Sequence, residues 1–125
     1  MTRILLVDDD VDLLISLKTF LKKQGYEITT TTTCSSGLNI LRSVEPNLVI
    51  LDINVGEEDG RSMCRQIKRE AELQHIPVIL ISANHQELGF YKNYGANASL
   101  PKPFRLNDLS ELIQKTLSGD NTIQQ

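Results

Sequence analysis

Short apolar runs rich in β-branched residues alternate five times with longer amphipathic stretches along the 125-residue chain. The expected strands are 4–7, 26–32, 48–51, 78–82 and 98–100. The expected helices are 10–24, 35–44, 59–72, 85–95 and 106–118. This alternation predicts parallel βα units with right-handed crossovers. The fold class is therefore α/β: a three-layer (βα)5 sandwich, with a doubly wound, parallel five-stranded sheet between two layers of helices.

The length and charge of the chain limit its class. At 14.0 kDa it is long enough for one domain with one packed core. We assign 1–118 to this domain and 119–125 to a polar C-terminal tail or the start of a linker. The net charge is −3 and the basic residues are scattered, which argues against nucleic-acid binding. No run approaches the roughly 18 apolar residues of a membrane span, and no secretory signal precedes the first strand, so we expect a cytoplasmic protein.

The cysteines and histidines show no metal-ligand spacing. Cys34 and Cys64 stand apart from each other and from His75 and His85, so we interpret both cysteines as free thiols in a reducing compartment. Both histidines are expected at surface loop or helix positions.

Acidic side chains follow two of the apolar strands, and a lysine follows the last one. Asp8 and Asp9 end the first strand, Asp52 ends the third, and Lys102 follows the fifth. Carboxylates about 4 Å apart repel by roughly 4 kcal/mol at an effective dielectric constant of about 20, and a bound dication would remove that cost. Magnesium fits best, because it prefers hard oxygen ligands and keeps positions open for phosphate oxygens. Asp10 is instead the expected N-cap of the first helix.

These residues resemble a response-regulator receiver domain, the phosphoacceptor half of two-component signalling, over nearly the whole chain. The resemblance implies a flavodoxin-like sheet of strand order 2-1-3-4-5. It implies that Asp52 is the phosphoacceptor, and that Asp9 and the backbone carbonyl of Asn54 join it in holding Mg²⁺. Asp8 would contact the metal mainly through water. The chain would be either a single-domain regulator similar to a chemotaxis receiver or a piece of a longer protein.

The end of the chain carries two more motifs of this resemblance. Ser82 matches the switch Ser/Thr that hydrogen-bonds a phosphoryl oxygen, and Ala83 matches the small residue beside it. Lys102 matches the lysine that pairs with the phosphoryl group. Lys102-Pro103-Phe104 resembles the family's Lys-Pro-Phe motif, in which the Lys-Pro bond is typically cis.

The resemblance also implies the partners. A sensor histidine kinase or a histidine phosphotransfer protein would supply the phosphoryl group, and an unknown downstream protein would respond to a conformational change. The domain would be a signalling domain rather than an enzyme, although it would assist its own phosphorylation and dephosphorylation. Direct contact with nucleic acid or a membrane is not expected.

Two stretches depart from the family pattern. Val55 and Gly56 stand where Met-Pro is usual, while Gly60 is kept, and Gly56 would loosen this loop because it lacks the fixed φ of proline. Ser99 stands at the position of the usual switch aromatic residue. An output mechanism that depends on burying that ring is therefore not expected.

Three other functions fit part of the pattern. A phosphohydrolase of the haloacid-dehalogenase type needs a second acid where this chain has Asn54, and its acidic pair would lie near the end of the chain. A flavin binder of the flavodoxin type needs a phosphate loop where this chain has Asp8 and Asp9, which would repel phosphate. The third alternative is a receiver domain that binds partners without phosphorylation. The complete set of acids, serine and lysine argues against it.

Overall fold

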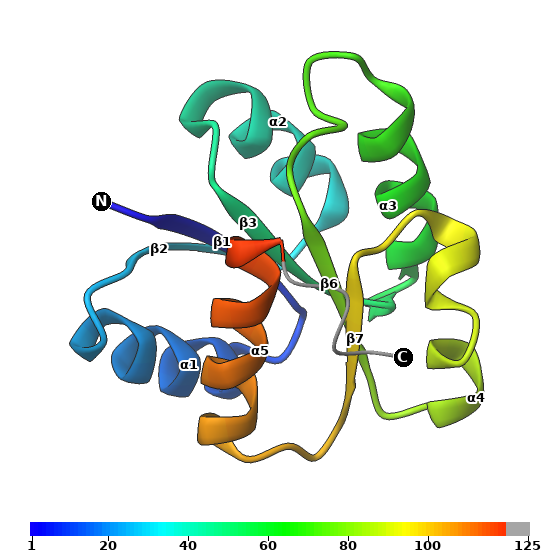
Figure 1. The fold of residues 1–125 in the computed structure, drawn as a ribbon. Helices are drawn as coiled ribbons and strands as arrows, with labels where there is room; N and C mark the ends of the chain where they lie inside the picture. The colour runs from blue at the N-terminus through cyan, green and yellow to red at the C-terminus, as the bar shows by residue number, and fades with distance from the viewer. Residues whose placement is uncertain (120–125) are drawn as a thin grey trace.

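The computed structural model describes residues 1–119, and its central element is a parallel five-stranded sheet. The strands are β1 (Arg3–Val7), β2 (Glu27–Thr31), β3 (Leu48–Asp52), β6 (Val78–Ser82) and β7 (Ala98–Pro101). Their order is β2-β1-β3-β6-β7 (Figure 1). Strands β4 and β5 form a separate hairpin, so this order confirms the expected 2-1-3-4-5 arrangement.

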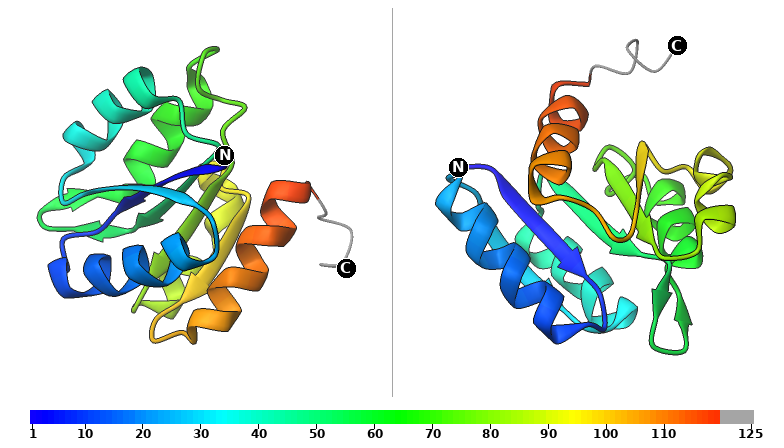
Figure 2. Two further views of the ribbon diagram at one scale, coloured as in Figure 1. Left: turned by 90° about the vertical axis from the view of Figure 1, so that its left-hand side faces the viewer. Right: turned by 90° about the horizontal axis from the view of Figure 1, so that it is seen from below.

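Helices cover both faces of the sheet. They are α1 (Val11–Lys23), α2 (Cys34–Val44), α3 (Gly60–Arg69), α4 (His85–Leu88), the 3₁₀ helix η1 (Tyr91–Tyr94) and α5 (Leu106–Ser118). Helices α1 and α5 lie on one face, and α2 and α3 lie on the other (Figure 2). The three-layer sandwich predicted from the sequence is confirmed.

The core consists of two apolar clusters, one on each face of the sheet. Successive side chains of a strand point to opposite faces, and β1 shows the division clearly. Ile4 and Leu6 belong to the cluster that contains the buried leucines of α1 and α5, whereas Leu5 and Val7 belong to the cluster of α2 and α3. Each fully buried leucine or isoleucine contributes about 1.5–3 kcal/mol, so the sheet holds the strand ends rigidly.

Polar side chains cap the helices at the carboxyl edge of the sheet. Asp10 Oδ1 accepts a hydrogen bond from the backbone N–H of Leu13, which confirms Asp10 as the N-cap of α1. Thr33 Oγ1 accepts from the N–H of Ser36 at the start of α2. These caps fix where each strand-to-helix loop turns.

Three segments differ from the expected elements. The expected helix 85–95 is wrong as a continuous element: α4 ends at Leu88, Gly89 and Phe90 follow, and η1 forms the remainder. Gly89 and the aromatic residues that follow it are weak helix formers, and the segment is too short for its other residues to compensate. Helix α3 ends at Arg69, before the expected 72. A hairpin of β4 (Asn54–Val55) and β5 (Glu58–Asp59), absent from the expectation, protrudes from the body of the domain (Figure 2, right).

Several smaller expectations can be compared with the structure. Cys34 and Cys64 are buried and free, and His75 and His85 are exposed, as expected. Gly119, with φ at 72°, ends α5. The remainder of the expected tail, 120–125, lies outside the described residues. Within residues 1–119, no helix has the length and apolar character needed to cross a membrane.

Candidate functional site

Three carboxylates meet at the carboxyl edge of the sheet. Val7 of β1 is paired in register with Leu51 of β3, so the residues that follow them, Asp8 and Asp52, end neighbouring strands side by side. Together with Asp9 they offer carboxylate oxygens that all lie within 4.8 Å of one another. Asp8 is 2% exposed and Asp52 is 5% exposed, whereas Asp9 is exposed. Two carboxyl groups are therefore held with little access to water.

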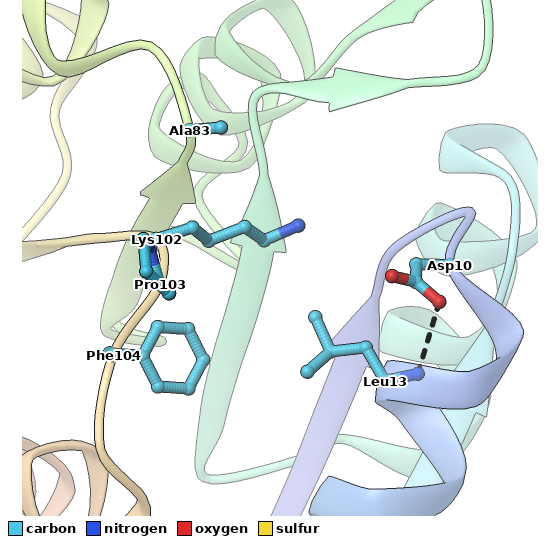
Figure 3. Close-up of a pocket in the computed structure, with 6 residues that line it drawn as sticks. All are labelled: Asp10, Leu13, Ala83, Lys102, Pro103 and Phe104. Carbon is cyan, nitrogen blue, oxygen red and sulfur yellow. Dashed lines mark hydrogen bonds between the residues drawn. The ribbon is translucent and has the colours of Figure 1, made fainter.

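Lys102 supplies the positive charge at this edge. Its Nζ lies 2.8 Å from Asp8 Oδ2 and 2.9 Å from Asp52 Oδ2. Its backbone N–H donates to the carbonyl of Ser82 at 2.8 Å, which ties the loop after β7 to the end of β6. The Lys102–Pro103 peptide bond is cis, as expected. Figure 3 shows the extended lysine side chain reaching across the end of β3 toward the turn that leads into α1.

For both Asp8 and Lys102, burial and the ion pair shift the pKa in opposite directions. Burial raises the pKa of Asp8 above its usual value, and the hydrogen bonds from Lys102 and from the N–H of Asp10 offset only part of that rise. Burial would lower the pKa of Lys102, but its hydrogen bonds to Asp8 and Asp52 outweigh burial and raise it. Lys102 is therefore a cation at neutral pH.

The hairpin after β3 holds Asp9 in place. Gly56 is the first central residue of its two-residue turn and has φ at 61°, a left-handed conformation that glycine adopts without strain. The N–H of Gly56 donates to Asp9 Oδ2 at 3.0 Å, and the N–H of Asn54 donates to Asp52 Oδ1 at 3.1 Å. The expectation that Gly56 loosens this segment stays a prediction, but the glycine also allows a tight turn that contacts the acidic cluster.

Gly60 allows the backbone after the hairpin to pack directly against the end of β3. Its N–H donates to the carbonyl of Ile53 at 2.6 Å. A Cβ atom at this position would lie 2.0 Å from the backbone oxygen of Asp52. No side chain fits there, so glycine is needed for this close approach beside Asp52.

Ser82 is fully buried at the end of β6, and its hydrogen bonds go to neighbours other than Asp52. Its hydroxyl donates to Glu87 Oε1 at 3.4 Å and accepts from the N–H of Asn84 at 2.9 Å. The side-chain amide of Asn54 donates to the same Glu87 oxygen at 3.2 Å. Glu87 was not among the residues expected from the sequence, because a single acid on a short, irregular helix gives no pattern.

A hollow of about 390 Å³ opens beside the acidic cluster. It is lined by Asp10, Leu13, Ala83, Lys102, Pro103 and Phe104 (Figure 3). In Figure 3 the Leu13 and Phe104 side chains face each other, and the Lys102 side chain extends above them. The hollow is therefore lined by apolar side chains together with the charged residues Asp10 and Lys102.

The fold and the site define a class: a doubly wound α/β domain with an acidic cluster and a lysine at the carboxyl edge of its sheet. Comparison with known families agrees with that class. The model of the response regulator receiver domain matches residues 4–114, and the chain belongs to this family.

Individual relatives give the same result. Protein PilH of Pseudomonas aeruginosa is 31% identical over 121 residues, which cover 95% of this chain and all of that protein. The transcriptional regulatory protein GltR of the same organism is 33% identical over 91% of this chain, but the chain spans only 48% of its length. This chain spans about half the length of several further relatives.

Solved structures match the whole sandwich. A receiver domain protein described as CheY-like, from Methanospirillum hungatei, superposes with a TM-score of 0.86 at 30% identity, covering 95% of both chains. A two-component response regulator from Clostridium difficile gives a TM-score of 0.86 at 26% identity, covering 97% of this chain and 99% of that one.

Proposed function

We propose that this chain is the phosphoacceptor of a two-component phosphorelay and that Asp52 receives the phosphoryl group. The observation that carries the proposal is the placement of one lysine ammonium within 2.9 Å of both Asp52 and Asp8, at the carboxyl edge of the sheet. A carboxylate so placed can act as a nucleophile, and the adjacent cation can neutralise the oxygens of the incoming group.

The proposed transfer exchanges one bond for another. An oxygen of Asp52 attacks the phosphorus of a partner's phosphohistidine, the P–N bond breaks, and an acyl phosphate forms while the imidazole leaves with the bonding electrons. Lys102 would then pair with a phosphoryl oxygen, and the Ser82 hydroxyl would donate to another. Catalysis of this kind depends mainly on positioning and charge neutralisation, so few side chains are needed.

The donor chemistry of the site fits Mg²⁺. The carboxylates of Asp9 and Asp52 and the backbone carbonyl of Asn54 would hold the ion, with Asp8 contacting it mainly through water. These are hard oxygen donors, and the three carboxylates already lie within 4.8 Å of one another. When bound, the ion would supply positive charge next to the phosphoryl oxygens.

The partners follow from the same chemistry. A sensor histidine kinase or a histidine phosphotransfer protein would place its phosphohistidine at the hollow beside Lys102. A downstream protein, rather than nucleic acid or a membrane, would read the conformational change in this domain. The two free thiols suit the reducing cytoplasm, where such a relay would operate. The domain would signal while assisting its own phosphorylation and dephosphorylation.

Incubation with acetyl phosphate and Mg²⁺, followed by intact mass measurement, tests this function. The wild-type protein should gain one phosphoryl group, and the gain should vanish in Asp52→Asn and when EDTA replaces Mg²⁺. Asp12→Asn, a change at an exposed acid in the first turn of α1, is the matched control and should behave as wild type. Wild-type modification of Asp52→Asn would overturn the assignment.

Calorimetric titration with Mg²⁺ tests the metal site separately. Asp9→Ala removes one of three carboxylates and should weaken binding by at least about tenfold, since a hard dication needs several oxygen ligands. Asp12→Ala should leave the affinity unchanged. Equal affinities in Asp9→Ala and wild type would contradict the proposed role of Asp9.

A further inference from the structure

We propose that Glu87 is a positioning residue of the phosphoacceptor site: it holds the Ser82 hydroxyl turned away from Asp52 until Asp52 carries a phosphoryl group. This inference rests on the proposed function and adds to it a residue of α4. Glu87 opposes the loaded state, because its contact with Ser82 must break before the hydroxyl can serve the phosphoryl group.

One oxygen of Glu87 accepts hydrogen bonds from two different strands beside the site. Oε1 accepts the Ser82 hydroxyl at 3.4 Å and the Asn54 side-chain amide at 3.2 Å. A serine hydroxyl has a single proton to donate, and the N–H of Asn84 already occupies the acceptor side of the same oxygen. The proton that Ser82 gives to Glu87 is therefore the one that a phosphoryl oxygen on Asp52 would require.

The second oxygen of Glu87 is held from α3. Oε2 lies 3.7 Å from Arg61 Nη2, and the Glu87 side chain is only 20% exposed. Arg61 is itself anchored: its Nε and Nη2 donate to the carboxylate of Asp59 at 2.9 and 2.8 Å, and its guanidinium lies 5.6 Å from the centre of the Tyr94 ring. Asp59 is the N-cap of α3. The contacts from Glu87 through Arg61 to Asp59 therefore connect Glu87 to the start of this helix.

When Asp52 carries a phosphoryl group, charge determines whether the Ser82 hydroxyl donates to that group or to Glu87. A phosphoryl group carries about −1.5 to −2 charge at neutral pH, more than a carboxylate, and so attracts the Ser82 proton more strongly. The same charge repels Glu87. Arg61 and Asn54 keep Glu87 in place in the unloaded state and favour the contact with Ser82, so removing the charge of Glu87 should favour the loaded state.

Affinity for the phosphoryl analogue beryllium trifluoride, measured with Mg²⁺ by fluorine NMR or calorimetry, tests the proposal. Glu87→Gln keeps an acceptor oxygen but loses the charge, and it should bind the analogue about two- to tenfold more tightly, the range expected for one net hydrogen bond. Glu87→Ala should show the same direction. Glu57→Gln, at the exposed hairpin turn, is the matched control for net charge and should change the affinity by less than about twofold.

A double-mutant cycle with Ser82→Ala separates positioning from simple charge repulsion. If Glu87 acts through Ser82, the gain from Glu87→Gln should disappear in the Ser82→Ala background. Unchanged affinity in both Glu87 variants, or an undiminished gain without the hydroxyl, would overturn the positioning role while wild-type binding still supported the proposed function. A wild-type protein that bound no analogue would instead overturn the proposed function, and the role of Glu87 with it.

Discussion

Lys102 Nζ lies 2.9 Å from Oδ2 of Asp52, although 50 positions separate the two residues in the sequence. The parallel sheet makes this contact possible, because β3 and β7 end at the same edge on either side of β6. The same ammonium also contacts Asp8, so one cation balances two buried carboxylates.

Lys102→Met should lower the free energy of unfolding by about 2 kcal/mol in the absence of divalent ions, because two buried carboxylates then lose their charge partner. Urea unfolding measures the change. Added Mg²⁺ should recover more stability in the variant than in the wild type. Lys115→Met, at an exposed position of α5, should stay within about 0.5 kcal/mol of wild type. A variant as stable as the wild type without Mg²⁺ would show that the charge balance is unimportant.

Gly60→Ala should destabilise the domain by about 2–3 kcal/mol and lower phosphorylation, because a Cβ there would clash with the backbone oxygen of Asp52. Thermal unfolding and acetyl phosphate labelling provide the measurements. Gly89→Ala is the control: Gly89 has an ordinary helical φ of −59°, and its added Cβ would come no closer than 3.3 Å to another atom. Equal effects at both glycines would count against the close approach at Gly60.

Gly56→Pro should destabilise this chain, even though the family pattern has proline at this position. Proline cannot adopt a φ of 61° and lacks the N–H that Asp9 accepts. Gly56→Ala keeps the N–H and should lose only about 1 kcal/mol. Urea unfolding of the two variants, with Mg²⁺ titration of each, compares them. A proline variant more stable than the alanine variant would contradict the hairpin described above.

Cys34 and Cys64 should react slowly with thiol reagents in the native protein. Burial raises the pKa of both thiols to about 11, aided at Cys34 by the charge of Glu58. In the unfolded state the pKa of each thiol is near 9.0, so between about pH 9 and 11 the unfolded protein loses protons that the folded protein keeps. The free energy of unfolding should therefore fall as pH rises through this range. Labelling with Ellman's reagent at pH 8, native against urea-denatured, measures reactivity, and equal rates would contradict the burial.

The sheet and the acidic cluster could be predicted from the sequence for one physical reason. Apolar runs mark core strands, and parallel strands end at one edge, so Asp8, Asp52 and Lys102 had to converge once the strands were recognised. The N-cap role of Asp10 was equally local, since a carboxylate before a periodic apolar stretch satisfies free backbone N–H groups.

The hairpin and the contacts of Glu87 could not be predicted in the same way. Strands β4 and β5 are two residues each, too short for any hydrophobic period, and the turn between them contacts Asp9, which lies far away in the sequence. Glu87 lies on the four-residue helix α4, where no hydrophobic period points to its contacts with Ser82 and Asn54. Such contacts depend on tertiary packing rather than on local pattern.

The central claim is that Asp52, and no other group at this edge, carries the phosphoryl group. Borohydride reduction of the acetyl phosphate-treated protein converts an aspartyl phosphate to homoserine, and peptide mass spectrometry locates the altered residue. We expect homoserine at position 52 alone, in the peptide between Arg42 and Arg61, and only in samples that contained Mg²⁺. Reduction at Asp8 or Asp9, or a stable phosphate on Ser82 with position 52 unaltered, would contradict the account.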